Sequence, residues 1–428
     1  MKLDNSYWVF VSESIDKLCI TFSSKSLYSC ALKIFDQYLS EENKNKRVIA
    51  IYMMGIMAEG FTNVMTENID EIFKKILQFK NDLNFEIRFA VLNTMGQFCT
   101  DFREKFSKNY SEQLSQLILD LMDDPVESVR RHAFSALINF TENVPPNSIL
   151  KYSPLFSEKI ENILKNENES EPVLNQTLTA LAGMANCLGK HFDQFYDKFI
   201  PYLLNYIIKK NNSPPSSLFI SNPTHSLPFE QCLSETQSRA AECATILFLS
   251  CVEQKKEIVI KDANTLASFL LHFPLLPTAP NMDRLIQCWT RIFKTLGTQF
   301  THIMSIIPSF IQMASYFPKI NLLNGDQCKL FFFLILFLHI FFFFAHFILH
   351  IFFLIFYEFF FYIIFFTFFF MLVNPQISIQ TSQLESKGIA IDMLIIVAET
   401  LGIKKNKNYM IILINFFFLK KEKNSIRS

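Results

Sequence analysis

The chain of 428 residues carries 40 basic and 40 acidic side chains, so its formal net charge is zero and its isoelectric point is near 7.1. This balance excludes a strongly charged protein that binds nucleic acid or an anionic surface through its overall charge. The length exceeds one compact domain. Only nine glycines occur, few of them within helical patterns, which predicts a nearly all-helical chain.

The N-terminal half contains an internal repeat. Three segments resemble one another: Lys46–Gly60, Glu86–Phe102 and Ser128–Val144. Their arginines Arg47, Arg88 and Arg130 are 41 and 42 residues apart, and we expect them at helix starts, paired with acids of neighbouring repeats. Each segment follows another amphipathic stretch: Leu27–Leu39, Asn68–Phe79 and Ser111–Met122. A helix, a short turn and a helix at this period are typical of HEAT repeats. We predict an all-α HEAT-repeat right-handed α-solenoid (superhelix) of antiparallel helix pairs.

Further pairs follow with less regular spacing. They are Leu155–Leu164 with Pro172–Leu188, Phe195–Ile208 with Glu235–Val252, and Ala263–Phe273 with Met282–Leu296. A last pair is expected to begin with His302–Ala314 and to end with Gln383–Leu401. The predicted organisation is a solenoid at 1–320 with a Pro/Ser-rich loop at 211–234, a Phe-rich insert at 329–373, the last HEAT helix at 376–403 and a tail at 404–428.

The segment from Phe331 to Phe370 is about half phenylalanine and has no helical period. One interpretation is a membrane hairpin, because about 20 apolar residues span a bilayer and this run is twice as long. The other is translated non-coding sequence, a retained intron or a gene-model error, because T-rich DNA is translated into strings of Phe. The run falls between the two helices of one expected pair, and its removal would leave an ordinary loop. We therefore favour the translated intron.

Several stretches carry a family resemblance. They are IRFAVLNTMGQFCTDF (87–102), SVRRHAFSALINFTENVPP (128–146), RAAECATILFLSCVEQKKE (239–257), CWTRIFKTLGTQFTHIMSIIPSFIQMAS (288–315) and LESKGIAIDMLIIVAETLG (384–402). Together they resemble the middle HEAT repeats of importin-β (karyopherin-β) nuclear transport receptors, closest to the importin beta-three subgroup, over residues 13–316 and 376–402. The resemblance implies a receptor that carries cargo through nuclear pores and releases it when RanGTP binds.

The chain departs from this family in ways that bear on partners. It is far shorter than a complete receptor, and the resemblance implies that it begins in the middle of the solenoid. We therefore expect it to lack the amino-terminal repeats to which the resemblance assigns binding of the Ran GTPase. The Phe-rich run stands where the subgroup has an acidic loop. We expect a fragment whose partners are protein cargo with basic import signals and FG nucleoporins. The resemblance does not extend to the repeats that bind Ran, so it does not predict Ran binding by this fragment.

The sequence contains no GxSxG, P-loop, HExxH or Gly-rich phosphate-binding motif. His346 and His350 are spaced i,i+4 but lie inside the Phe-rich run. Cys187 and His191 share this spacing, without a second pair that would complete a zinc site. We expect no enzymatic activity, no cofactor and no metal site.

A stripe of acids and amides recurs from repeat to repeat. The candidate cargo-binding residues are Glu59, Asn93, Gln97, Asp101, Asn139, Glu142 and Asn186. A separate apolar face comprises Val91, Met95, Phe98 and Phe102, then Leu137, Phe140 and Val144. In a solenoid the second helix of each pair lines the concave wall, so equivalent residues form a ladder along it. Acids near helix C-termini oppose the helix dipole, a cost without structural reward. We predict that the ladder binds an extended basic peptide; a solvated helix face is the alternative.

The leading hypothesis is a nuclear import receptor that shuttles between cytoplasm and nucleus and binds the basic import signals of cargo on its concave HEAT surface. The first alternative is a generic HEAT-repeat scaffold for protein assembly. The second is a membrane-tethered helical protein, which requires the Phe-rich insert to be genuine. Nucleic acid is not an expected partner.

Overall fold

A computed structural model of the chain describes residues 5–22, 25–209, 233–273, 275, 281–300, 303–314, 388–390 and 392–393. These residues form helices and turns, with no strand in the described ranges. The Phe-rich insert 329–373 and the tail 404–428 lie outside the described residues, as do nearly all of the loop 211–234 and most of the predicted last helix. The translated-intron and membrane-hairpin interpretations both concern residues outside the described ranges.

The chain divides into two compact units, residues 1–274 with 279–304 and residues 275–278 with 305–428. The first unit contains six helix pairs. Their first helices are α2 (Lys25–Ser40), α5 (Ile69–Leu77), α8 (Ser111–Leu121), α11 (Ser153–Lys165), α13 (Asp193–Lys209) and α15 (Lys256–Leu270). Their second helices are α3 (Lys44–Ile56), α6 (Phe85–Asp101), α9 (Glu127–Asn143), α12 (Glu171–Leu188), α14 (Glu235–Cys251) and α16 (Met282–Leu296). Most of α17 (Ile303–Ala314) belongs to the second unit.

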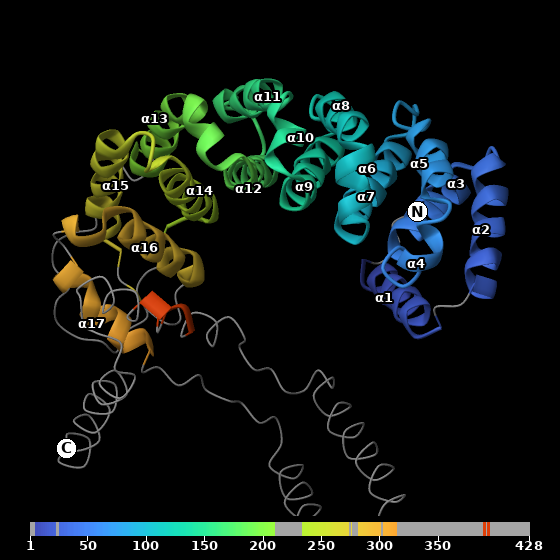
Figure 1. Ribbon diagram of the computed structural model, residues 1–428, viewed down its shortest axis with the longest axis horizontal. Helices are drawn as coiled ribbons and strands as arrows, with labels where there is room; N and C mark the ends of the chain where they lie inside the picture. Colours follow the sequence, from blue (N-terminus) through green and yellow to red (C-terminus); the bar gives the residue numbers. More distant parts are fainter. Residues whose placement is uncertain are drawn as a thin grey trace, which may run out of the picture. The chain divides into compact units, whose positions relative to one another are not determined.

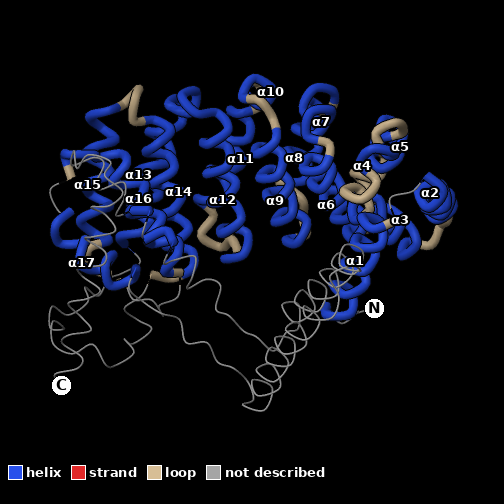
Figure 2. The backbone as a smooth tube through the Cα atoms, turned by 60° about the horizontal axis from the view of Figure 1, so that its bottom comes forward, coloured by secondary structure: helices blue, strands red, loops and turns tan. Residues whose placement is uncertain are grey.

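Within the first unit, each second helix packs against the second helix of the next pair, in the order α3, α6, α9, α12, α14, α16. Figure 1 shows these helices along the inside of an arc and the first helices along its outside, most clearly from α8 to α16. Figure 2 shows the pairs stacked side by side. Six of the predicted HEAT-repeat pairs are confirmed, including the contact between the helices of Glu86–Phe102 and Ser128–Val144, and the second helix of the predicted last pair lies mostly outside the described residues. We refer to the second helices as the inner helices.

The inner helices pack closely because small residues lie where they meet. A Cβ added at Gly96 of α6 would lie 3.3 Å from Asn139 Nδ2 on α9. The Thr94 hydroxyl donates to the Ile51 carbonyl of α3 at 2.8 Å. The predicted apolar face is buried except for Val144, which is half-buried at the end of α9. Burial of these side chains stabilises each helix at about 25 cal/mol per Å² of apolar area removed from water.

Arginines at the starts of the inner helices connect successive repeats. The Arg88 guanidinium donates to both carboxylate oxygens of Asp124 at 2.6 and 2.9 Å, and Arg130 pairs with Glu169 at 2.9 Å. The predicted pairing across repeats is confirmed for these two arginines. Arg47 instead donates to the Glu41 carbonyl at 2.7 Å. Its guanidinium carbon lies 5.8 Å from the centre of the Phe79 ring, so it contacts the next pair through an aromatic side chain.

Two differences from the predicted elements have physical causes. Helix α15 begins at Lys256, seven residues before the predicted Ala263, because Val259 already belongs to its buried stripe although charged residues surround it. Helix α1 (Asn5–Thr21) precedes the first predicted pair. Its weak amphipathic pattern and exposed Phe10 and Leu18 explain why the sequence pattern did not predict it. Among the described residues, the helices are all too short or too polar to traverse a bilayer.

Candidate functional site

The predicted ladder lies on the inner helices. Asn93, Gln97 and Asp101 lie on α6, Asn139 and Glu142 on α9, Asn186 on α12, and Glu59 in the turn after α3. The side chains of Glu59, Glu142 and Asn186 are exposed. Those of Asn139 and of the three residues on α6 are half-buried. The side chains are thus accessible from one row of helices, which is the arrangement that an extended ligand requires.

The centre of this row is Asp101, the last residue of α6. Gln97 Nε2 donates to its Oδ2 at 3.0 Å, one turn earlier on the same face. Burial raises the pKa of Asp101, and the negative charges of Glu59 and Asp16 raise it further, whereas the hydrogen bond from Gln97 and the positive charge of Arg103 oppose this change. The carboxylates of Asp16 and Glu59 therefore repel the carboxylate of Asp101. A cation placed among them would relieve their mutual repulsion.

Asp16 was not among the predicted site residues. It lies half-buried on α1, a helix that the sequence pattern did not predict. Its separation from Glu59 is 43 residues, so extending the register of the ladder back by one repeat could have found it.

Gly60 allows α1 to reach this position. A Cβ added at Gly60 would lie 2.5 Å from the Cys19 carbonyl carbon and 2.6 Å from the Ile20 nitrogen. These are backbone atoms that cannot move aside, so only glycine permits the approach. Because Gly60 directly follows Glu59, the contact brings the α1 acid to the α3 turn. The tertiary contact, rather than the local sequence, joins Asp16 to the site.

Asn139 extends the row from α6 to α9, because its amide lies against Gly96, the neighbour of Gln97. Glu142 lies one turn further along α9 and is exposed. It is not among the groups that shift the pKa of Asp101. Asn186 is exposed two residues before the end of α12. The structure thus joins Gln97 to Asp101 by a hydrogen bond and places the Asn139 amide against Gly96, with Glu142 and Asn186 as separate positions further along the row. We call Asp16, Glu59, Asp101 and Glu142 the acidic ladder.

His132 on α9 is a structural residue. Its ring lies 4.3 Å from the Phe89 ring of α6, centre to centre, and burial lowers its pKa to about 4. It is therefore neutral at pH 7 and packs between two inner helices.

The described helices define a class of protein, a HEAT-repeat solenoid whose inner row carries acids in register. No protein-family profile matches the chain. Importin subunit beta-3 of Saccharomyces cerevisiae is 22% identical over 322 residues, which cover 74% of this chain and 28% of that protein. A probable importin subunit beta-4 of Schizosaccharomyces pombe is 23% identical over 189 residues, which cover 44% of this chain and 17% of that protein. The chain therefore spans less than a third of the length of these relatives.

Solved structures of Kap121p share the fold. Kap121p bound to Pho4p superposes with a TM-score of 0.68 at 19% identity, over 91% of this chain and 32% of that one. A Kap121p variant with two aspartates and one glutamate replaced by lysine superposes with a TM-score of 0.62 at 20% identity, over 74% of this chain and 28% of that one. These curated relatives are importin beta subunits, which supports the resemblance of the chain to the importin-β (karyopherin-β) family.

Proposed function

We propose that this chain is the cargo-binding part of a nuclear import receptor, and that its acidic ladder binds an extended basic segment of the cargo. The names of its relatives support a role in import. Structures of Kap121p bound to Pho4p, Ste12p and Nup53p support binding of protein partners by this fold. The proposal implies shuttling between cytoplasm and nucleus and needs no catalytic group. Binding of FG nucleoporins, and of Ran by a longer chain, belongs to the same proposal.

One observation carries the proposal to particular residues. The three acids replaced by lysine in the Kap121p variant are 43 and 42 residues apart. Asp16, Glu59 and Asp101 have the same two separations, and after burial the charges of Asp16 and Glu59 also raise the pKa of Asp101. The agreement supports these three acids as the main cargo contacts, with Glu142 as an extension of the ladder.

The geometry of the ladder suggests the spacing of basic residues in the cargo. Packed helices lie about 8–10 Å apart, and an extended chain advances about 3.3 Å per residue. Acids one repeat apart are therefore about three peptide residues apart. A segment with Lys or Arg at roughly every third position would place one cation at each acid, with Gln97 and Asn139 available to bond its main chain.

The test is a titration of the full chain with a fluorescent peptide that has three lysines at three-residue intervals. We expect Glu59→Lys with Asp101→Lys to weaken binding by about tenfold or more, because two attractive contacts become repulsive. The matched control is Glu158→Lys with Glu257→Lys, which makes the same change of charge at exposed positions on the first helices α11 and α15. Equal affinities of the two variants would refute the proposed site, and no binding to the wild-type chain would favour a generic scaffold.

A further inference from the structure

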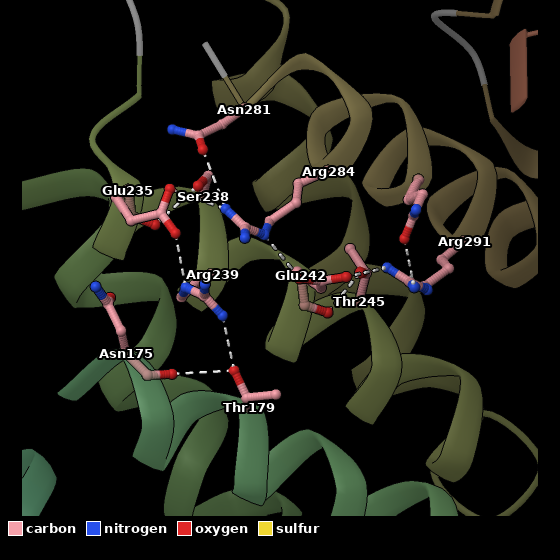
Figure 3. A network of polar contacts seen from close by, with 11 residues as sticks. Asn175, Thr179, Glu235, Ser238, Arg239, Glu242, Thr245, Asn281, Arg284 and Arg291 are labelled. Carbon is pink, nitrogen blue, oxygen red and sulfur yellow. Dashed lines mark hydrogen bonds and ion pairs between the residues drawn. The ribbon is translucent and has the colours of Figure 1, made fainter. Parts of the chain in front are cut away.

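The charge of the inner row changes sign toward its C-terminal end. Three arginines lie on the last two inner helices of the first unit, Arg239 on α14 and Arg284 and Arg291 on α16. We call them the arginine row. Figure 3 shows them as a connected network with two glutamates of α14. Their side chains keep about a fifth to a quarter of their surface exposed.

Two glutamates alternate with the three arginines. Glu235 pairs with Arg239 and with Arg284, both at 2.9 Å. Glu242 lies 3.4 Å from Arg284 Nε and 3.6 Å from Arg291 Nη1. Within this network, three guanidinium groups face two carboxylates, so one positive charge remains. Outside the network, α16 also carries the exposed Lys294 and, next to Arg284, Asp283, whose charges offset each other, so one net positive charge remains on these two helices.

Arg291 is the least neutralised member. Its Nη2 donates to the neutral amide oxygen of Gln287 at 3.0 Å. Its Nη1 is buried and has no hydrogen-bond acceptor among the described residues, since the 3.6 Å to Glu242 exceeds hydrogen-bond length. A buried donor without an acceptor is unfavourable. Exchanging the amide of Gln287 for an incoming carboxylate is favourable, because charge-assisted hydrogen bonds are about twice as strong as neutral ones.

The arginine row continues the surface on which the acidic ladder lies. Arg239 Nη1 donates to Thr179 Oγ1 on α12 at 3.0 Å. Thr179 is two helical turns before Asn186, on the same face of α12. A ligand lying along the inner helices would therefore pass from the acids, over Asn186 and Thr179, to the arginines.

We propose that the arginine row binds the carboxylates of an acidic peptide segment, so that a partner with a basic and an acidic part lies along the inner helices in one direction. The planar guanidinium fork matches a carboxylate. A nucleic acid is disfavoured because the chain has no net positive charge to attract a polyanion. Only the direction of the partner rests on the proposed function. Binding of an acidic peptide alone does not.

The experiment uses the full chain and a fluorescent 12-residue peptide rich in Asp and Glu. We expect Arg239→Gln with Arg291→Gln to weaken its binding by about tenfold or more, while leaving binding of the lysine peptide unchanged. These two arginines are the ends of the network, so Arg284 still pairs with both glutamates. The matched control is Lys256→Gln with Lys261→Gln, two exposed residues of α15, which should bind the acidic peptide as the wild type does.

Further arms separate the alternatives. Arg291→Lys keeps the charge but loses the fork, so it should weaken binding less than Arg291→Gln and serves if the double variant unfolds. The inference is overturned if the wild type does not bind the acidic peptide, or if the arginine and control variants bind it equally. It is also overturned if single-stranded DNA of equal charge binds as tightly with the same dependence on Arg291. If Glu59→Lys with Asp101→Lys loses binding of the lysine peptide but keeps binding of the acidic peptide, the two peptides bind to separate sites, as the inference requires.

Discussion

Replacement of Asp101 by Asn should stabilise the fold while it weakens binding of basic peptides. The pKa of Asp101 is raised because burial, Glu59 and Asp16 outweigh the opposing effects of Gln97 and Arg103, so its ionised form at pH 7 costs stability. As the last residue of α6 it also opposes the helix dipole. Asn keeps a side-chain oxygen that can accept the hydrogen bond from Gln97. The substitution therefore removes the unfavourable charge and leaves its local partner satisfied.

The size of the effect follows from these contacts. A charge at the unfavourable end of a helix costs about 0.3–1 kcal/mol, and each like-charged neighbour adds a few tenths of a kcal/mol. We expect a gain of about 1 kcal/mol at pH 7, which raises Tm by about 2 °C in a unit of this size. Affinity for the lysine peptide should fall at the same time, because one carboxylate of the ladder is lost.

The pH dependence gives an independent check. A carboxyl group whose folded-state pKa is raised costs stability in full above that pKa, and the cost falls to zero only as pH drops through the ordinary, unfolded-state pKa. The difference in Tm between Asp101→Asn and the wild type should therefore shrink as pH falls and Asp101 becomes protonated. The matched control is Asp283→Asn, in the first turn of α16, where a negative charge is favourable and no gain should appear. A lower Tm for Asp101→Asn at pH 7 would refute the reasoning.

Three further predictions concern stability. Arg88→Ala should lower the free energy of unfolding by about 3–5 kcal/mol, because it leaves buried Asp124 without its bidentate partner. Lys44→Ala, which removes an exposed pair with Glu86, should lower it by less than about 1 kcal/mol. Similar losses for the two variants in urea unfolding would contradict this prediction. Gly60→Ala should lower Tm and release α1, seen as faster amide hydrogen exchange in residues 5–21, because its Cβ meets backbone atoms at 2.5 Å; unchanged exchange would show that α1 does not depend on this contact. His132 has a folded-state pKa of about 4, so the wild type should lose up to about 3 kcal/mol as pH falls from about 6.5 to 4, and His132→Gln should lack that loss.

The inner-helix prediction succeeded because its signals are local. The apolar spacing of Val91, Met95 and Phe98 identifies the buried face of α6, and the arginine period identifies equivalent helices. Weak local signals led to the failures. Helix α1 was not predicted, and the start of α15 was placed seven residues late, because charged side chains surround the first buried position. Of the four acids in the proposed ladder, the sequence pattern identified Glu59, Asp101 and Glu142 as candidates, whereas Asp16 was not recognised because it lies on α1.

The amino-acid sequence by itself determined the repeat and the fold class, because each HEAT pair contacts mainly its neighbours and the helical period reports its buried face directly. It also placed Asp101 and Glu142 near helix ends. The tertiary structure decided which charges act together. Asp16 joins Glu59 and Asp101 through the backbone contact at Gly60, and Arg284 joins Glu235 and Glu242 across two helices. Electrostatic interaction depends on the distance between charges, and these distances are set by how closely the helices pack rather than by separation along the chain.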